Sequence, residues 1–143
     1  RKAVEEDQKY EMAYYNMAQA YMNLRNYDDA LKSIRQCLKY YPDYNRGLNL
    51  MGMAYLNKNN FENALQVFTR NMKLNPKYVA SFYYAGVIYA QNNDMKTAEK
   101  YLIEAIEVNG RYKPAYLLLA RIYQMTGNEA KAREVTARAN ALR

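Results

Sequence analysis

The sequence predicts an all-α protein, and more narrowly a right-handed superhelical solenoid of helix-turn-helix repeats. Three observations favour this fold class. Similar residues return every 34 positions along the 143-residue chain, apolar residues within each repeat follow the period of an amphipathic helix, and alternating β-branched runs are missing. Because one pair of helices cannot bury its apolar face alone, we expect successive pairs to stack.

Four series of residues carry the 34-residue spacing. They are Tyr10, Tyr44, Tyr78 and Tyr112; Tyr21, Tyr55, Tyr89 and Tyr123; Ala30, Ala64, Ala98 and Ala132; and Pro42, Pro76 and Gly110. We therefore expect repeats at residues 11–44, 45–78, 79–112 and 113–143, within one domain that spans 1–143. Residues 1–10 fit either the tail of a preceding repeat or an extension of the first helix.

The first repeat shows how each pair of helices is encoded. An apolar stripe from Tyr14 to Tyr21, at positions i, i+3, i+4 and i+7, predicts the first helix. The polar stretch 23–27 predicts a turn, and a second stripe from Ala30 to Leu38 predicts the second helix. Pro42 ends that helix because proline lacks the N–H and crowds the preceding turn.

Later repeats follow the same plan with their own signals. Gly127, Asn59 and Asn93 tolerate the left-handed conformation that often ends a helix, and Pro114 suits the first turn of the next one. Small residues recur at two places, which predicts that the two helices of each pair approach closely. These residues are Ala18, Gly52, Gly86 and Ala120, together with Ala30, Ala64, Ala98 and Ala132.

Composition argues against catalysis and against metal or cofactor binding. The chain has no histidine and one cysteine, Cys37, which removes imidazole catalysis and multi-cysteine metal sites. Glycine-rich phosphate loops and nucleophile elbows are missing as well. We therefore expect no enzyme activity, no cofactor and no metal site.

Charge is unevenly spread. Of the net charge of +7, residues 111–143 carry seven basic and two acidic residues, a net of +5. The longest uncharged stretch, residues 78–93, is too short and too polar to cross a bilayer. We expect a cytoplasmic protein, or a periplasmic or membrane-associated one if a signal or anchor has been removed.

The second repeat supplies the most specific motif. Its large, small, aromatic and proline places hold Leu48, Gly52, Tyr55, Ala64, Phe68 and Pro76. This pattern resembles the tetratricopeptide repeat, and the other repeats resemble it with local departures, such as Gly110 in the proline place. The resemblance implies an interaction scaffold that binds another protein, as a peptide or a helix, in the groove lined by the first helix of each pair.

The expected groove residues lie beside the packing stripe of each first helix. They are Met12, Tyr15, Gln19 and Met22; Arg46, Asn49, Met53 and Leu56; Tyr83, Tyr84 and Val87; and Leu117 and Arg121. Methionines suit varied ligands, tyrosines serve as amphipathic anchors, and the two arginines could pair with an acidic group of the partner. The same tyrosines and methionines could instead pack between repeats.

Two further functions stay open. Identical chains could assemble through exposed apolar ends, as in family members that coat organelles or build secretion and pilus machines. The basic C-terminal third would also permit RNA binding by a helical repeat array. However, cations at the groove places are confined to Arg46 and Arg121, which disfavours nucleic acid as the partner.

Overall fold

The computed structural model describes residues 2–142, and for residues 2–9 and 11 it describes the backbone alone. Within this range the chain forms eight α-helices and no strand, which confirms the all-α prediction. Its contacts divide it into two compact units, residues 1–75 and 76–143. The expectation of one domain over 1–143 stays a prediction.

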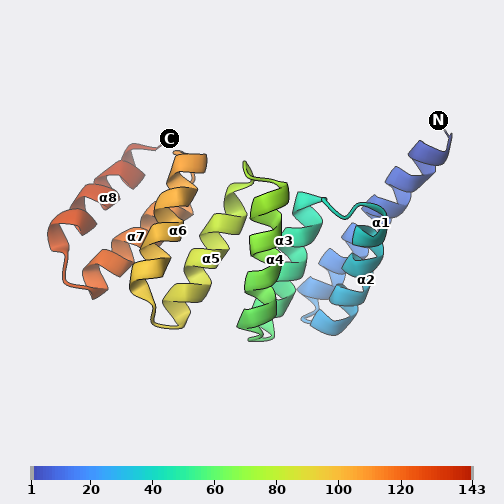
Figure 1. Ribbon diagram of the computed structural model, residues 1–143, viewed down its shortest axis with the longest axis horizontal. Coiled ribbons are helices and arrows are strands. Elements are labelled where there is room, and N and C mark those ends of the chain that lie inside the picture. Colours follow the sequence, from blue (N-terminus) through green and yellow to red (C-terminus); the bar gives the residue numbers. More distant parts are fainter. Residues whose placement is uncertain (1, 143) are drawn as a thin grey trace. The chain divides into compact units, whose positions relative to one another are not determined.

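The first unit holds two helix pairs. They are α1 (Lys2–Asn23) with α2 (Tyr27–Tyr40), and α3 (Asn45–Asn57) with α4 (Phe61–Leu74). Short turns make the helices of a pair antiparallel, and α3 also packs on α2 and α1 (Figure 1). Residues 2–10 lie in the same unbroken helix as the first predicted stripe.

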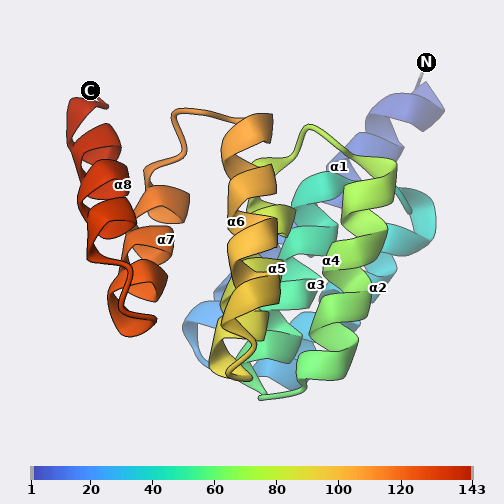
Figure 2. The same cartoon turned by 60° about the vertical axis from the view of Figure 1, so that its left-hand side comes forward.

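The second unit repeats the plan. Its helices are α5 (Val79–Gln91), α6 (Met95–Val108), α7 (Lys113–Met125) and α8 (Glu129–Ala141). Here α7 packs on both α6 and α5, and α8 covers the other side of α7 (Figure 2). Pro114 lies in the first turn of α7, as predicted.

One recurring turn joins the two helices of each pair. Its left-handed residue is Asn59, Asn93 or Gly127 in the later pairs, as predicted, and Arg25 in the first. The next residue, at position 26, 60, 94 or 128, is Asn or Asp, and its side chain accepts a hydrogen bond from the backbone N–H three residues on. The sequence reasoning missed these N-caps, although Asn and Asp are preferred at that place.

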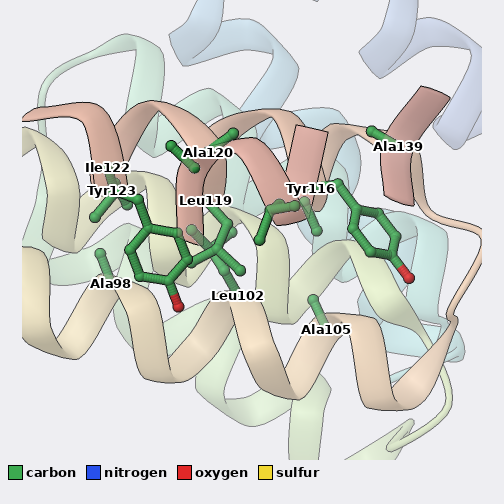
Figure 3. Close-up of a cluster of buried hydrophobic side chains, with 12 residues drawn as sticks. Ala98, Leu102, Ala105, Tyr116, Leu119, Ala120, Ile122, Tyr123 and Ala139 are labelled. Carbon is green, nitrogen blue, oxygen red and sulfur yellow. The ribbon is translucent and has the colours of Figure 1, made fainter. Parts of the chain in front are cut away.

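Small residues bring the paired helices together. Ala18, Ala64 and Ala98 are fully buried, and a Cβ atom added to Gly52 would lie 2.5 Å from the Phe68 ring. Figure 3 shows a contact between successive pairs, where Tyr116 and Tyr123 of α7 lie over small side chains of α6. Within the pair α5–α6, a Cβ atom added to Gly86 would lie 2.9 Å from the Leu102 side chain. The close approach that the sequence predicts is therefore confirmed.

Met17 departs from the predicted packing stripe. It is 46% exposed, whereas Ala85 and Leu119 at the equivalent places are buried. Leu119 belongs to a core that includes residues of α6, the helix that precedes its own pair. No helix pair precedes α1 within residues 2–142, so Met17 has nothing to pack against on that side.

Candidate functional site

The α1–α3 groove is the candidate site of the first unit. It encloses about 640 Å³, and its lining combines amide, methionine and tyrosine side chains. The lining residues are Tyr15, Gln19, Met22, Asn23, Arg25, Tyr27, Asn49, Leu50, Met53 and Asn57. Arg25 supplies the one charged side chain of this lining, so the groove is suited to hydrogen bonding more than to ion pairing.

Tyr15 both lines the α1–α3 groove and packs in a core. It is 7% exposed and belongs to the core of the first unit with Ile34 and Cys37. Its ring meets the Tyr44 ring edge-on at 5.6 Å, and the Arg46 guanidinium lies 5.3 Å from the ring centroid. The ring is covered because Tyr44 and Arg46, at the start of α3, close over it.

Hydrogen bonds within the α1–α3 groove fix some of its polar groups. Gln19 Nε2 donates to the Tyr15 hydroxyl at 3.1 Å, and Asn49 Nδ2 lies 3.5 Å from Met53 Sδ. Among the described residues, Asn49 Oδ1 is buried and accepts no hydrogen bond. An amide oxygen at this place can accept a hydrogen bond from water or from a bound molecule.

The α5–α7 groove is the candidate site of the second unit, and it is more apolar. It consists of two adjoining cavities of about 320 and 220 Å³ that share Tyr83, Leu118 and Arg121. The remaining lining residues are Val87, Ala90, Gln91, Met95, Ile122 and Met125 in the first cavity, and Pro114 and Leu117 in the second. Met125 and Leu117 are largely exposed at its edges.

A cluster of tyrosines lies at one side of the α5–α7 groove. The Tyr83 ring lies 5.2 Å from that of Tyr84 and 5.6 Å from that of Tyr112, both edge-on. Burial raises the pKa of Tyr83 and Tyr84, and the positive charge of Arg121 partly opposes the rise at Tyr83. Burial together with the neighbouring tyrosines raises the pKa of Tyr112 to about 12. The hydroxyls are therefore neutral near pH 7, and Arg121 supplies the positive charge of the groove.

Most of the residues expected in a groove do line one of the two. The α1–α3 groove contains Tyr15, Gln19, Met22, Asn49 and Met53, and the α5–α7 groove contains Tyr83, Val87, Leu117 and Arg121. Four expected residues line neither cavity. Met12 is exposed on α1, Arg46 covers Tyr15, Leu56 is half-buried on α3, and Tyr84 packs against Tyr83.

The sequence reasoning missed the residues that complete each lining. Leu50 and Leu118 each come one residue after an expected groove residue, Asn49 and Leu117. Both line a cavity because two neighbouring stripes of one helix can face the same groove. Met95 and Tyr27 come from the first turn of α6 and of α2, at the end of the groove. Tyr27 and Met95 are equivalent in the 34-residue alignment, but Glu129 at the same place breaks the apolar pattern that could have indicated them.

Within residues 10 and 12–142, no three Cys, Asp or Glu side chains gather closely enough to hold a metal ion. Over the same part of the chain, no helix is long and apolar enough to span a bilayer.

Comparison with known proteins decides the family. Residues 15–71 and 50–114 match the pattern of the tetratricopeptide repeat family, which covers well over half of the chain. The chain belongs to the tetratricopeptide repeat family. Repeats of this family commonly form scaffolds for protein interactions.

Solved structures share the fold of this tetratricopeptide repeat chain. The crystal structure of MamA is 18% identical with a TM-score of 0.80, over 96% of this chain and 81% of that one. TTC0263, a thermophilic TPR protein in Thermus thermophilus, is 22% identical with a TM-score of 0.78, over 92% of this chain and 74% of that one. Identities this low show a common fold alone. No curated protein sequence matches the chain.

Proposed function

We propose that the chain is an interaction scaffold whose α5–α7 groove binds a segment of another protein. The observation that carries this proposal is the combination of apolar and charged groups in that groove. Leu117 is 50% exposed beside Tyr83 and Arg121. Exposed aliphatic and aromatic side chains next to a single arginine are typical of protein-binding surfaces.

The shape of the groove indicates what the bound segment contains. Two adjoining cavities that share Tyr83, Leu118 and Arg121 suit two apolar anchor side chains of the partner. An acidic group between or beside the anchors would pair with the exposed Arg121 guanidinium. We therefore propose a peptide or helix with two aliphatic or aromatic anchors and one carboxylate.

The α1–α3 groove supports a second, more polar contact. Its amides, Gln19, Asn49 and Asn57, can hydrogen-bond to the main chain of a bound segment, while Met22 and Met53 adapt to varied side chains. The buried Asn49 Oδ1 would then gain the donor that it lacks within the described residues.

A peptide selection tests the proposal directly. A displayed random-peptide library is selected on the immobilised chain, and the enriched peptides are measured by fluorescence anisotropy against three proteins: unmodified, Arg121→Ala and Arg133→Ala. Arg133 is a matched control, because it is an exposed arginine of the same unit that lines neither groove. We expect Arg121→Ala to weaken binding about 10-fold and Arg133→Ala to have little effect.

The remaining outcomes are informative as well. Enriched peptides should contain an acidic residue and lose binding with Tyr83→Ala, since that side chain lines both cavities. Equal losses for the two arginine variants would reject the groove assignment. Tight binding of single-stranded RNA that collapses steeply with added salt would replace the peptide by nucleic acid as the partner.

A further inference from the structure

A groove separates α6 from α8 in the second unit. Within residues 2–142, both helices pack on α7 but not on each other (Figure 2). The groove encloses about 360 Å³, and its apolar lining consists of Ile103, Ile106, Leu119 and Val135. Described helices therefore form its floor and both of its walls. This α6–α8 groove shares no lining residue with the α5–α7 groove.

Charges of alternating sign line the α8 wall of the α6–α8 groove. Lys131, Glu134 and Arg138 follow one another at steps of three and four residues, which places them on one face of α8. Side chains at these steps can pair with each other, but among the described residues no ion pair joins Glu134 to either cation. Lys131 Nζ instead lies 5.6 Å from the centroid of the Tyr123 ring. The Arg138 guanidinium lies 5.1 Å from the centroid of the Tyr116 ring. The Glu134 carboxylate and both cations can therefore pair with the charges of a partner.

The first unit does not repeat this lining. Arg35 of α2 occupies the place of Ile103, and its Nη2 atom donates a hydrogen bond to the Tyr55 hydroxyl at 3.0 Å. A charged side chain thus crosses from α2 to α3, where the second unit presents Ile103, which is 39% exposed. The places of the three charged residues of α8 hold Asn63, Gln66 and Arg70. The apolar and alternating lining is therefore particular to the second unit and is not required by the repeat fold.

The balance of charge in the α6–α8 groove favours a partner with charges of both signs. The α8 wall has the cations Lys131 and Arg138 with the carboxylate of Glu134 between them, and the α6 wall has Glu107. Two positive and two negative side chains cancel. A uniformly charged partner, such as nucleic acid, would meet repulsion as well as attraction in this groove.

The spacing of the lining indicates a helix as the occupant. Side chains at steps of three and four residues on both walls are those that a helix packs against another helix. An amphipathic helix lying beside α8 would place its apolar stripe on Ile103, Ile106 and Val135. Its flank towards α8 would then meet a cation, a carboxylate and a cation in turn. The complementary flank has an acidic, a basic and an acidic residue at the same steps.

We propose that the α6–α8 groove binds an amphipathic helix of another protein, with an apolar stripe and an acid–base–acid flank at steps of three and four residues. The charged contact runs from Lys131 to Arg138, seven steps of about 1.5 Å, or roughly 10 Å. An interface of about two helical turns is small, so the affinity is micromolar. Because the two grooves share no residue, this helix and a segment in the α5–α7 groove can bind together.

Two designed peptides test the proposal. Each is a fluorescent helical peptide of about 20 residues with a leucine stripe, and one flank has either Glu, Lys and Glu or Lys, Glu and Lys at the proposed steps. Fluorescence anisotropy measures their affinities for the unmodified chain. We expect the Glu-Lys-Glu peptide to bind at least about 10-fold more tightly than the Lys-Glu-Lys peptide. Ile103→Ser should weaken the binding of the Glu-Lys-Glu peptide, because the leucine stripe then loses an apolar contact.

Reversal of the α8 wall separates specific pairing from net charge. Lys131→Glu, Glu134→Lys and Arg138→Glu together should reverse the preference, so that the Lys-Glu-Lys peptide binds more tightly. Arg133→Glu is the matched control, because it lowers the net charge by the same amount at an exposed position of α8 outside the groove. This control should keep the preference of the unmodified chain. Equal affinities of the two peptides for the unmodified chain, or the same preference after the reversal, would overturn the proposal.

The two grooves are told apart with Tyr83→Ala, which changes the α5–α7 groove alone. Binding of the Glu-Lys-Glu peptide should survive this substitution. A loss of binding would place the peptide in the α5–α7 groove and overturn the present proposal, while the function proposed for that groove would stand.

Discussion

The contact between Gly52 and Phe68 shows how single residues set the distance between paired helices. In the second pair, Gly52 lies directly against the Phe68 ring. No space remains there for a Cβ atom, so only glycine fits at position 52. The equivalent pairs are Ala18 with Ile34, Gly86 with Leu102, and Ala120 with Thr136, so the one aromatic ring of this series is paired with a glycine.

Gly52→Ala should therefore destabilise the protein by about 1–3 kcal/mol, because the added methyl group overlaps the Phe68 ring. Urea unfolding followed by circular dichroism measures the change. Phe68→Ile in the Gly52→Ala background should recover part of the loss, since Ala with Ile is the combination of the first pair. A stability unaffected by Gly52→Ala would mean that the helices are not in contact at this place.

Arg25 holds a backbone conformation that suits other residues better. Its φ is 60°, in the left-handed region that Asn59, Asn93 and Gly127 occupy in the other pairs. Arg25→Asn should raise the free energy of unfolding by about 0.5–1 kcal/mol, because asparagine tolerates this region more readily than arginine. Arg25→Ala removes the same charge and keeps the unfavourable φ, so it should give no gain. Equal gains in the two variants would assign the effect to charge.

At the scale of the helices, Asn71 fixes the end of α4 to the start of α3. Alanine is found at the equivalent positions 105 and 139, but Asn71 is fully buried. Asn71 Nδ2 donates to the Asn45 carbonyl at 3.1 Å, and its Oδ1 accepts from Asn75 Nδ2 at 2.8 Å. Asn75 Nδ2 also donates to the Asp43 carbonyl at 2.9 Å, so the two amides hold the loop before α3.

Asn71→Asp should lower the free energy of unfolding by more than about 2 kcal/mol at pH 7, because it buries a carboxylate against the Asn45 carbonyl. Asn71→Ala should cost less, since it removes both hydrogen bonds without introducing a charge. Thermal unfolding of both variants measures the difference. Equal stability of the two would show that the amide donor is unimportant here.

The helices and turns could be predicted from the sequence because their causes are local. The apolar period, Pro42, Pro114 and the left-handed asparagines all act within a few residues of their own position. The burial of Tyr15 could not be predicted in this way, because the residues that cover it, Tyr44 and Arg46, begin the next helix pair. The exposure of Met17 depends in the same way on whether another helix lies beside α1.

At the scale of the whole molecule, buried tyrosines couple stability to alkaline pH. Burial raises the pKa of Tyr112 to about 12, from an ordinary value of 10 that holds when the chain is unfolded. The folded state therefore binds this proton more tightly than the unfolded state. Its contribution to stability is complete below pH 10 and is lost as the pH rises from 10 towards 12.

The urea midpoint should accordingly fall between pH 10 and pH 12. Tyr112→Phe should make this fall shallower, because phenylalanine has no proton to lose. Tyr40→Phe, which removes an exposed hydroxyl, serves as the control and should leave the slope unchanged. If the two variants follow the same curve, the tyrosine cluster beside the α5–α7 groove is not the source of the pH dependence.

The amino-acid order alone is enough to establish the period of the chain, the positions of its helices and turns, and the repeat family, because each follows from residues close together or from their exact recurrence. The folded arrangement is needed to establish which candidate side chains line a cavity. Tyr15 and Tyr83 occupy equivalent places and each lines a groove, but Tyr15 is almost fully buried because Tyr44 and Arg46 close over it, whereas Tyr83 stays partly exposed and its ring meets Tyr84 and Tyr112. Exposure depends on contacts between helices, and the spacing along one helix does not record them.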